Sequence, residues 1–538
     1  MTATPGGWDV IVVGGGVTGA GTARDLALRG LSVLLLEKDD WGGGTSGASS
    51  WLIHGGPRYL TFDWQTTRLS CIDAGHIVRI AGHMVHRCVF LLPVLPGDRY
   101  GLERMETAME VYDRFQPLKL SNPHSRLTPR EALRLEPGLS SRIRGALTME
   151  EWGVDPHRLV WANVLDATRH GAQAHNHSQV VGLVRDGQRV IGVRYRQCGR
   201  VLEARARLVV NAAGPWVPEI AGMAGARVQL RPAKGIHIVY DRRLSNFAIS
   251  AEAIDGRELL LVPHGPITIL GTTDDDYYGN LDTGEVLPDE VQYLLQGMER
   301  SFPTIREYRP VRATVGVRPT LFAWRRYEDD LSRRHEVIDH EDRDGPAGLV
   351  TIAGGKLSMY RLMAEQTADR VCHRLGVEAT SRTATSPLPG AETEAPLPRD
   401  LARAHGLSAL AAARMLERHG CGAPDLLAGG GAGARRIVCR CEALTEGELA
   451  NAARREQVQT LADAFRRVGL GAGPCAGAAC LERAAEIVGR ELGWSSGQRR
   501  QAVRDHLQLA WRGRSPLLDR WGWAQEELAY GARRGWPA

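Results

Sequence analysis

Four cysteines near the C-terminus have the spacing of metal ligands. Cys439 and Cys441 form a C-x-C pair, and Cys475 and Cys480 form a C-x4-C pair after the 33 residues 442–474. Four thiolates suit a 2Fe–2S cluster, and they also suit a structural zinc ion. Three glycines shortly before Cys475 permit a tight loop that brings the second pair to the first. Because a C-x-C pair is less usual for zinc than C-x2-C, the pattern favours the redox cluster.

A glycine-rich turn at the start of the chain is the second chemical signal. It has the pattern G-x-G-x-x-G, made by Gly14, Gly16 and Gly19. An apolar run at residues 8–13 precedes it, and a helix-like stretch at residues 20–28 follows. The glycines let a pyrophosphate approach the helix N-terminus, and Glu37, after the next apolar run, can accept hydrogen bonds from ribose hydroxyls. This order of elements predicts a dinucleotide site, and its position at the N-terminus favours FAD over NAD.

Such a site needs a parallel sheet to hold it. Residues 208–214 read Leu-Val-Val-Asn-Ala-Ala-Gly, and they look like the strand that returns beside the dinucleotide in flavin folds. Residues 348–356 look like a further strand that leads into a helix beginning near Leu357. The glycines of this segment can bring backbone N–H groups close to a flavin.

A series of longer motifs resembles a known family. FAD-dependent glycerol-3-phosphate dehydrogenases carry similar segments in the same order, and the resemblance runs from residue 8 to about residue 375. The matching segments are Thr45-Ser46 and residues 52–60, 231–237, 271–274, 316–319, 331–333 and 354–361. The cysteine region resembles the small helical iron–sulfur domain of bacterioferritin-associated ferredoxin, with the C-x4-C spacing that this family uses. The large subunit of the anaerobic type carries such a domain and the single-subunit aerobic type lacks it, so the chain resembles the anaerobic large subunit. The tail from Trp511 to Trp536 also resembles the end of that subunit, so the resemblance covers nearly the whole chain.

The resemblance implies an α/β fold. A Rossmann-like FAD-binding domain is interleaved with a mixed-sheet substrate domain, as in D-amino-acid oxidase, and a small helical 2Fe–2S domain follows. Within an oxidoreductase unit of residues 1–385, we expect FAD-binding parts near 8–60, 150–220 and 345–375 and substrate-domain parts near 75–150 and 225–345. We expect a linker with a short helical stretch at 386–435, the 2Fe–2S domain at 436–490 and a C-terminal tail at 491–538.

The resemblance also implies a set of substrate contacts. Arg58, Tyr59, Arg318 and Arg333 match family positions that gather round a phosphorylated substrate, and Lys356 matches a lysine near the reactive face of the flavin. Arginine forks bind phosphate oxygens bidentately, and a dianion needs more than one of them, so the chemistry agrees with the resemblance. Any one of these arginines, taken alone, is better interpreted as a solvated surface group.

The expected FAD contacts come from several parts of the chain. They are Gly14, Gly16, Gly19, Glu37, Lys38, Thr45, Ser46, His54, Gly55, Val180, Ala213, Gly214, Trp216, Gly354, Gly355, Lys356 and Leu357. Three positions near the flavin depart from the family pattern: Ala48 and Trp51 stand where a basic residue is usual, and Pro57 where an aliphatic residue is usual. These departures leave open a related FAD enzyme that acts on another hydroxy acid, polyol or amine. A third interpretation, from another class, is an electron-transfer subunit that does not turn over substrate.

The implied reaction is oxidation of sn-glycerol 3-phosphate at C2 to dihydroxyacetone phosphate. A hydride passes to FAD while a base removes the hydroxyl proton. His237 is the candidate base because imidazole titrates near neutral pH, and His54 is the alternative. A histidine in an apolar strand such as residues 236–239 is, however, often purely structural. Lys356 and Arg333 are expected to stabilise the developing alkoxide.

Composition restricts the partners and the location. The net charge of +5, from 67 basic and 62 acidic residues, is small and no basic run occurs, so we expect no nucleic-acid partner. We expect a small anionic substrate, and partner subunits that take electrons from the cluster to the quinone pool. The N-terminus lacks a secretory pattern, no apolar run approaches about 18 residues, and the cysteines suit a reducing compartment, so we expect a cytoplasmic protein. Peripheral contact with the inner face of the cell membrane is compatible with Trp511, Trp521, Trp523 and Trp536 beside Arg520, Arg533 and Arg534, although a packed tail is the simpler interpretation.

Overall fold

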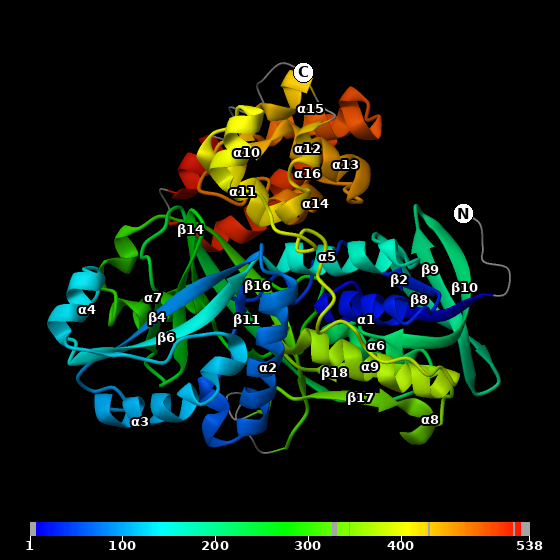
Figure 1. Ribbon diagram of the computed structural model, residues 1–538, viewed down its shortest axis with the longest axis horizontal. Coiled ribbons are helices and arrows are strands. Elements are labelled where there is room, and N and C mark those ends of the chain that lie inside the picture. Colours follow the sequence, from blue (N-terminus) through cyan, green and yellow to red (C-terminus); the bar gives the residue numbers. More distant parts are fainter. Residues whose placement is uncertain (1–6, 325–330, 344, 429–430, 520–521, 529–538) are drawn as a thin grey trace.

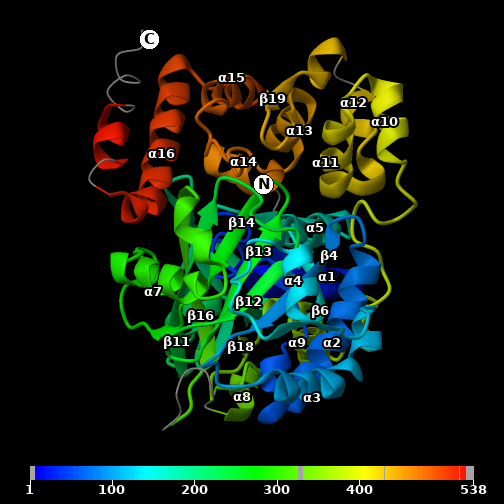
Figure 2. The same cartoon turned by 90° about the vertical axis from the view of Figure 1, so that its left-hand side faces the viewer.

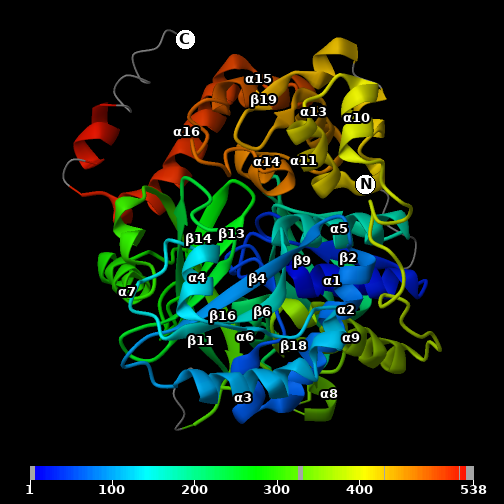
Figure 3. The same ribbon diagram turned by 60° about the vertical axis from the view of Figure 1, so that its left-hand side comes forward.

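The computed structural model describes residues 7–324, 331–343, 345–428, 431–519 and 522–528 (Figure 1). Two sheets lie side by side in the main body, and helices from the C-terminal part of the chain cover one end of both (Figure 1, Figure 3). The first sheet carries the glycine turn, and the second sheet forms the other half of the main body.

The first sheet has eight strands, six of which run in the order β17-β18-β10-β1-β2-β7. Its strands are β1 (Trp8–Val13), β2 (Val33–Leu36), β7 (Gln173–His175), β8 (Ser178–Asp186), β9 (Arg189–Gln197), β10 (Arg200–Asn211), β17 (His335–Asp339) and β18 (Leu349–Gly354). β1 pairs in parallel with β2 and β10, and β10 pairs in parallel with β18. Burial on both faces explains why these strands are continuous apolar runs. The strands predicted at 208–214 and 348–356 therefore belong to the same sheet as the first strand, as expected.

Three helices pack together on one face of this sheet (Figure 1). They are α1 (Val17–Leu28), α5 (Pro156–Arg169) and α9 (Tyr360–Leu375). Every residue of α1 except Thr18 is buried, so this helix lies between the sheet and its two neighbours. Gly21 permits this close packing, because a Cβ there would lie 3.0 Å from the ring of Tyr360. α6 (Val217–Gly222) belongs to the apolar cluster that includes Ile11 and Val209.

The second sheet has ten strands, eight of which run in the order β15-β11-β14-β13-β12-β4-β6-β3. Its strands are β3 (Leu52–Ile53), β4 (Val85–Val94), β5 (Arg126–Leu127), β6 (Gly145–Val154), β11 (Leu230–Tyr240), β12 (Ala248–Glu252), β13 (Glu258–His264), β14 (Ile267–Gly271), β15 (Asp275–Asp276) and β16 (Pro310–Leu321). β16 pairs with β11 along nearly its whole length, which brings Arg318 opposite Ala233 and Thr314 opposite His237. Most strands of this sheet pair in the antiparallel sense, and β12 with β4 is a parallel pair. α3 (Leu102–Asp113), α4 (Pro129–Leu135) and α7 (Pro288–Glu299) lie around it (Figure 2).

The segment after β2 crosses from the first sheet to the second. It forms β3, which pairs with β6, and then the short helix η1 (Pro57–Thr61). α2 (Trp64–Ile80) follows, and its first turn is capped by Asp63, whose side chain accepts a hydrogen bond from the Thr66 N–H at 3.2 Å. Another short helix, η2 (Gln116–Lys119), packs on α2. Residues 54–56 therefore lie at the junction of the two sheets.

Residues 398–519, here called the C-terminal unit, are mainly helical. Its helices are α10 (Pro398–His405), α11 (Ala409–His419), α12 (Asp425–Ala428), α13 (Glu446–Arg455), α14 (Leu461–Val468), α15 (Leu481–Leu492) and α16 (Ser496–Arg514). A small ribbon of β19 (Ile437–Cys439) and β20 (Leu444–Thr445) precedes α13. The first three helices lie in the stretch that we expected to be a linker with a short helical part, and Leu401, Met415 and Leu427 form an apolar cluster there.

α16 runs back toward the main body and meets β16 (Figure 2). In the tail, Trp511 contacts Trp523 edge to face with ring centroids 4.9 Å apart. Within the described ranges, no helix is long and apolar enough to cross a membrane. The remaining residues of the expected tail surface, namely Arg520, Trp521, Arg533, Arg534 and Trp536, lie outside the described residues.

Candidate active site

The glycine turn is built so that side chains are excluded. A Cβ on Gly19 would overlap the carbonyl oxygen of Gly14, and a Cβ on Gly14, whose φ is +110°, would lie 2.5 Å from the Ala212 carbonyl oxygen. Gly16 is the N-cap of α1 and offers no side chain there. The N-terminus of α1 is therefore open to an anionic group, as the pattern predicts.

Glu37, the residue after β2, holds this turn by hydrogen bonds. Its carboxylate accepts hydrogen bonds from the Gly15 N–H at 2.6 Å and from the Asp39 N–H at 2.9 Å. Burial raises the pKa of Glu37, although the two backbone hydrogen bonds oppose that shift. The contact of Glu37 with ribose hydroxyls stays a prediction.

Other predicted cofactor residues gather around the same end of the sheet. Lys38 Nζ lies 3.7 Å from the centre of the Trp216 ring and forms an ion pair with Asp282. Trp216 Nε1 is buried and has no hydrogen-bond partner among the described residues. Val180 packs in one apolar cluster with Val13 and Ala213, at the end of β1 and β10. A buried indole N–H beside an open helix N-terminus fits a polar ligand such as a dinucleotide.

Thr45 and Ser46 hold the segment that covers the turn. Ser46 Oγ accepts a hydrogen bond from the Val17 N–H at 3.0 Å, at the start of α1. Thr45 Oγ1 donates to the Val317 carbonyl oxygen on β16 at 2.5 Å. These two bonds tie the crossing segment to α1 and to the second sheet, which explains why a polar pair is needed there.

The predicted substrate residues converge from three distant segments. Arg58 and Tyr59 lie on η1, Arg318 on β16, and Arg333 shortly before β17. Arg58 and Lys356 both lie over the Tyr59 ring, at 5.0 and 5.1 Å from its centre. Burial would raise the pKa of Tyr59, but the charges of Arg58, Lys356 and Arg333 outweigh burial and lower it. These residues, with Arg318, are called the basic cluster below.

Asp274 holds two members of the basic cluster in place. Its carboxylate accepts from Arg318 Nη1 at 3.0 Å and from Arg333 Nη2 at 2.9 Å. Arg318 Nη2 also donates to Thr272 Oγ1 at 2.9 Å, and Arg333 Nη1 donates to Thr320 Oγ1. The 271–274 motif is one of the family matches in the sequence, but it did not mark Asp274 as a site residue. An acidic residue in a motif that accompanies predicted phosphate-binding arginines is the sequence signal that could have indicated this role.

The two candidate bases have different surroundings. His237, on β11, has Nε2 2.9 Å from Ser50 Oγ, and its Nδ1 is buried without a partner among the described residues. Burial, and less strongly the charge of Arg318, lower the pKa of His237 to about 3. His54 lies between β3 and η1, and burial together with the charges of Lys356 and Arg58 lowers its pKa well below the usual value. Both imidazoles are therefore neutral near pH 7.

The four predicted metal ligands come together in two pairs. Cys439 lies close enough to Cys480 to interact with it, and Cys441 lies close enough to Cys475. The Cys480 thiol donates to the Gly477 carbonyl oxygen at 3.8 Å. The interaction with Cys480, opposed by burial, lowers the pKa of Cys439 to about 6. Gly473 permits the approach of the two loops, because a Cβ there would lie 2.5 Å from the Cβ of Cys441.

A dense polar interface joins the C-terminal unit to the main body. Asp40, in the segment after Glu37, is 1% exposed and accepts from Arg467 Nη2 at 2.5 Å and from Arg466 Nη1 at 3.2 Å. Arg158 on α5 forms a buried ion pair of 2.9 Å with Glu456. The last turn of α14 is therefore fixed on the cofactor segment a few residues before the cysteine loop.

Asp40, His177 and Asp463 place possible ligand atoms within 4.8 Å of one another. The guanidinium groups of Arg466 and Arg467 already neutralise Asp40, and His177 Nε2 lies 3.1 Å from an Asp463 oxygen. The group is therefore an ion-pair network, and its charge balance gives no place for a cation.

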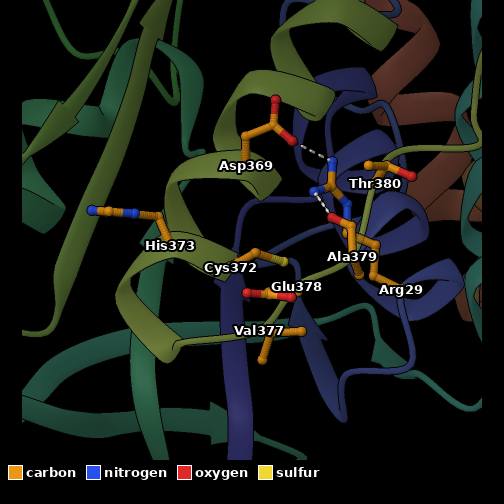
Figure 4. A pocket seen from close by; sticks show the side chains of 8 residues that line it. All are labelled: Arg29, Asp369, Cys372, His373, Val377, Glu378, Ala379 and Thr380. Carbon is orange, nitrogen blue, oxygen red and sulfur yellow. Dashed lines mark hydrogen bonds and ion pairs between the residues drawn. The ribbon is translucent and has the colours of Figure 1, made fainter.

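A surface pocket at the far ends of α1 and α9 has no comparable chemistry (Figure 4). The guanidinium of Arg29 pairs with Asp369 at 2.8 Å and donates to the Ala379 carbonyl oxygen at 2.8 Å. His373 points away from this pair. The charge of Arg29 is therefore balanced by Asp369, so the pocket offers no anion site like the one formed by the basic cluster.

Comparison with known proteins identifies the family. A family model described as FAD dependent oxidoreductase matches residues 9–370, and one described as the C-terminal domain of alpha-glycerophosphate oxidase matches residues 381–499. The chain is 37% identical to the A-type subunit of the anaerobic glycerol-3-phosphate dehydrogenase of Escherichia coli (strain K12), over 97% of this chain and 95% of that protein. This chain belongs to the FAD-dependent glycerol-3-phosphate dehydrogenase family.

Further members and structures agree with the family assignment. The corresponding A1-type subunit of the anaerobic glycerol-3-phosphate dehydrogenase of Haloferax volcanii is 34% identical over 95% of this chain and 87% of that protein. The structure of the glycerol-3-phosphate dehydrogenase from Bacillus halodurans complexed with FAD has a TM-score of 0.75 and 25% identity, and 96% of each chain is covered. Glycine oxidase from Geobacillus kaustophilus shares the fold, with a TM-score of 0.51 and 23% identity over 71% of this chain and 98% of that chain. The predicted fold class, the family and an FAD-dependent oxidoreductase are confirmed.

Proposed function

We propose that this protein oxidises sn-glycerol 3-phosphate to dihydroxyacetone phosphate. The basic cluster is the observation that carries the proposal, because it offers three arginine side chains and a lysine to one small region. Arginine forks match the oxygens of a phosphate group, and a dianion needs several of them. Asp274 neutralises part of this charge and orients Arg318 and Arg333, so the region is an ordered anion site.

FAD fits the glycine turn, where the α1 N-terminus is open and the Trp216 N–H has no partner in the described part of the chain. We assign its binding to the turn, to Glu37, Lys38, Thr45 and Ser46, and to the other predicted contacts, which reach from His54 to Leu357. When bound, FAD supplies the acceptor for the hydride that leaves C2 of the substrate. His237 takes the proton of the C2 hydroxyl in this proposal, and Lys356 and Arg333 stabilise the negative charge on that oxygen. His54, which lies in the field of Lys356 and Arg58, is the second candidate base.

We also propose that the four cysteines bind a 2Fe–2S cluster, which supplies a one-electron carrier when bound. The proximity of Cys439 to Cys480 and of Cys441 to Cys475 supports this ligand set, because each iron of such a cluster takes two thiolates. A structural zinc ion needs all four thiolates around one point. Partner subunits then receive the electrons for the quinone pool, and the protein works in the cytoplasm with at most peripheral membrane contact.

An anaerobic absorbance titration of the purified protein tests the substrate. We expect glycerol 3-phosphate to bleach the bound flavin, and glycerol or lactate to leave it oxidised. A flavin that stays oxidised with glycerol 3-phosphate contradicts the proposal. In that case a related enzyme for another hydroxy acid, polyol or amine becomes the leading interpretation, and an unreactive flavin with every donor favours an electron-transfer subunit.

Metal analysis tests the cluster separately. We expect iron in the wild-type protein and its loss in Cys441→Ser, with flavin content and flavin reduction by substrate unchanged. Cys198→Ser is the matched control, because Cys198 is an exposed free cysteine in the main body, between β9 and β10. Zinc in place of iron in the wild-type protein, purified without oxygen, rules out the redox role.

A further inference from the structure

A buried glutamate lies directly beneath the His54–Gly55 loop. Glu151, on β6, is 1% exposed. Its Oε1 accepts from the Tyr112 hydroxyl at 2.5 Å, and its Oε2 accepts from the Gly55 N–H at 3.2 Å. Oε2 also forms an ion pair with Lys119 Nζ at 2.5 Å, and both side chains are fully buried. Donors from α3, η2 and the active-site loop therefore converge on one carboxylate.

The Gly55 peptide is held from its other end as well. Lys356 Nζ donates to the Gly55 carbonyl oxygen at 3.4 Å. A Cβ on Gly55 would overlap the Tyr112 hydroxyl and lie 2.5 Å from Cys71 Sγ, so the loop is pressed against these side chains. The loop that carries His54 is thus held by the Glu151 carboxylate on one side and by the Lys356 ammonium group on the other.

The same carboxylate acts on Lys356 through charge. Burial lowers the pKa of Lys356, while Tyr59, Cys71 and Glu151 raise it and Arg58 lowers it. Burial, and less strongly Glu151, raise the pKa of Cys71 to about 12, so that thiol is neutral and offers no negative charge. Of the described side chains that raise the pKa of Lys356, Glu151 is the one that carries a carboxyl group.

The charged side chains that act on His54 are all positive. His54 lies in the field of Lys356, Arg58 and Lys119, which all lower its pKa in addition to burial, the largest cause. Without Glu151, the buried Lys119 would lose its counter-charge and would add to the repulsion in this loop.

We propose that Glu151 is a positioning residue of the active site, which fixes the loop of His54 and Gly55 to which Lys356 donates its hydrogen bond. It does so through the loop and not by touching substrate. The inference rests on the proposed function for the role of Lys356, and it adds a residue outside every motif that suggested that function.

The test compares the FAD-bound enzyme with its Glu151→Gln variant. A glutamine offers one acceptor oxygen and places an N–H₂ group against the donors of Tyr112, Lys119 and Gly55. We expect the rate of flavin reduction by glycerol 3-phosphate to fall about tenfold or more, with little change in KM, because the phosphate arginines are untouched. We also expect the alkaline limb of the pH profile to move about one unit toward lower pH, since Lys356 loses an attracting charge.

Glu150→Gln is the matched control. Glu150 is the preceding residue on β6, and its side chain bonds Arg87 and Asn122 on the opposite face. We expect its pH profile to coincide with that of the wild-type enzyme. An unchanged profile in Glu151→Gln, equal to that of the control, contradicts the proposal.

A double variant separates positioning from simple stability. Glu151→Gln with Lys119→Met removes both buried charges, so we expect the melting temperature to recover while the rate of flavin reduction stays low, because the Gly55 N–H still lacks its carboxylate partner. Recovery of the rate together with the melting temperature would reduce Glu151 to a structural role and overturn the proposal.

A substrate-free measurement keeps the two proposals distinct. The flavin midpoint potential of the FAD-bound protein is measured across pH, without glycerol 3-phosphate. At neutral pH we expect a higher potential in Glu151→Gln than in the wild-type protein and in Glu150→Gln, because the loss of a buried negative charge leaves Lys119 unpaired and favours the reduced, more negative flavin. If the potential is shifted but glycerol 3-phosphate does not reduce the flavin, the proposed substrate is wrong and the proposed role of Glu151 stands. If the three proteins have equal potentials, the proposed role of Glu151 is wrong.

Discussion

At the scale of single residues, the choice of base depends on two neutral histidines. We expect His237→Asn to lower the rate of flavin reduction by about 10²–10⁴-fold with a small effect on KM, as removal of a general base does. The pKa of about 3 means that protonation of His237 removes the base only in strong acid, so the rate should not fall between pH 8 and pH 5 through this group. Stopped-flow flavin reduction across pH measures both effects.

His54→Asn is the comparison for that experiment. If only His54→Asn loses the rate and His237→Asn reacts normally, the role of base belongs to His54. A loss of bound flavin in either variant is detected by absorbance, and rates are therefore given per bound flavin.

Asp274 gives a prediction about substrate affinity. Asp274→Asn removes the charge that holds Arg318 and Arg333, so we expect KM for glycerol 3-phosphate to rise about tenfold, consistent with the loss of charge-assisted hydrogen bonds. Flavin content should stay normal, because the hydrogen bonds of the Asp274 carboxylate go to these arginines and not to the glycine turn. The matched control is Asp275→Asn, since the Asp275 side chain is exposed and lies 3.8 Å from Arg257 in a looser ion pair. Equal KM values for both variants contradict the role of Asp274.

At the scale of elements, the turn between β1 and α1 decides whether the cofactor is retained. Gly19→Ala puts a methyl group on the Gly14 carbonyl oxygen, so the turn must open. We expect the variant to purify with little FAD and to melt at a lower temperature. Gly222→Ala is the control, because no atom of the described residues lies within 4 Å of a Cβ there, and it should keep its flavin. Full flavin occupancy in Gly19→Ala would show that the turn does not hold the cofactor as proposed.

The sequence predicts well those elements whose patterns lie in neighbouring residues. The strand, glycines and helix of residues 8–28 are read from neighbouring residues, and the strands at 208–214 and 348–356 from their apolar runs. The roles of Asp274 and Glu151 depend on pairing between segments far apart, such as Gly55 with a residue 96 positions later, and no local pattern reports that pairing. Helices α10 to α12 lie where Pro-rich and Gly-rich patches suggested mainly a linker, because their apolar residues pack chiefly on one another. The predicted domain boundaries stay predictions.

At the scale of the whole molecule, the interface at Asp40 fixes the C-terminal unit on the main body. Arg467→Met leaves a buried carboxylate without its main partner, so we expect a loss of about 3–5 kcal/mol in the free energy of unfolding. Urea unfolding of the purified variant measures it. Arg440→Met, at an exposed arginine between the first two cysteines, is the control and should unfold like the wild-type protein.

The same ion pair gives a pH dependence of stability. Burial would raise the pKa of Asp40, but Arg467 and Arg466 outweigh it and lower the pKa from 3.8 to about 2. A lowered carboxyl pKa contributes stability that is complete above the unfolded value and is lost as pH falls through the folded value. Between pH 5 and pH 2, the wild-type protein should therefore lose more stability than Arg467→Met does. Parallel losses in the two proteins would show that Asp40 is not the group responsible.

The contact between Asp40 and Arg467 also has a consequence for how the protein is made. The two residues are 427 positions apart, so a ribosome that adds about 5–20 residues per second makes the second roughly 20–85 seconds after the first. During that interval nothing from the C-terminal unit covers the segment around Asp40. A chain that ends before α14 keeps Asp40 without its arginines, so the buried ion pair can stabilise only a chain translated through α14.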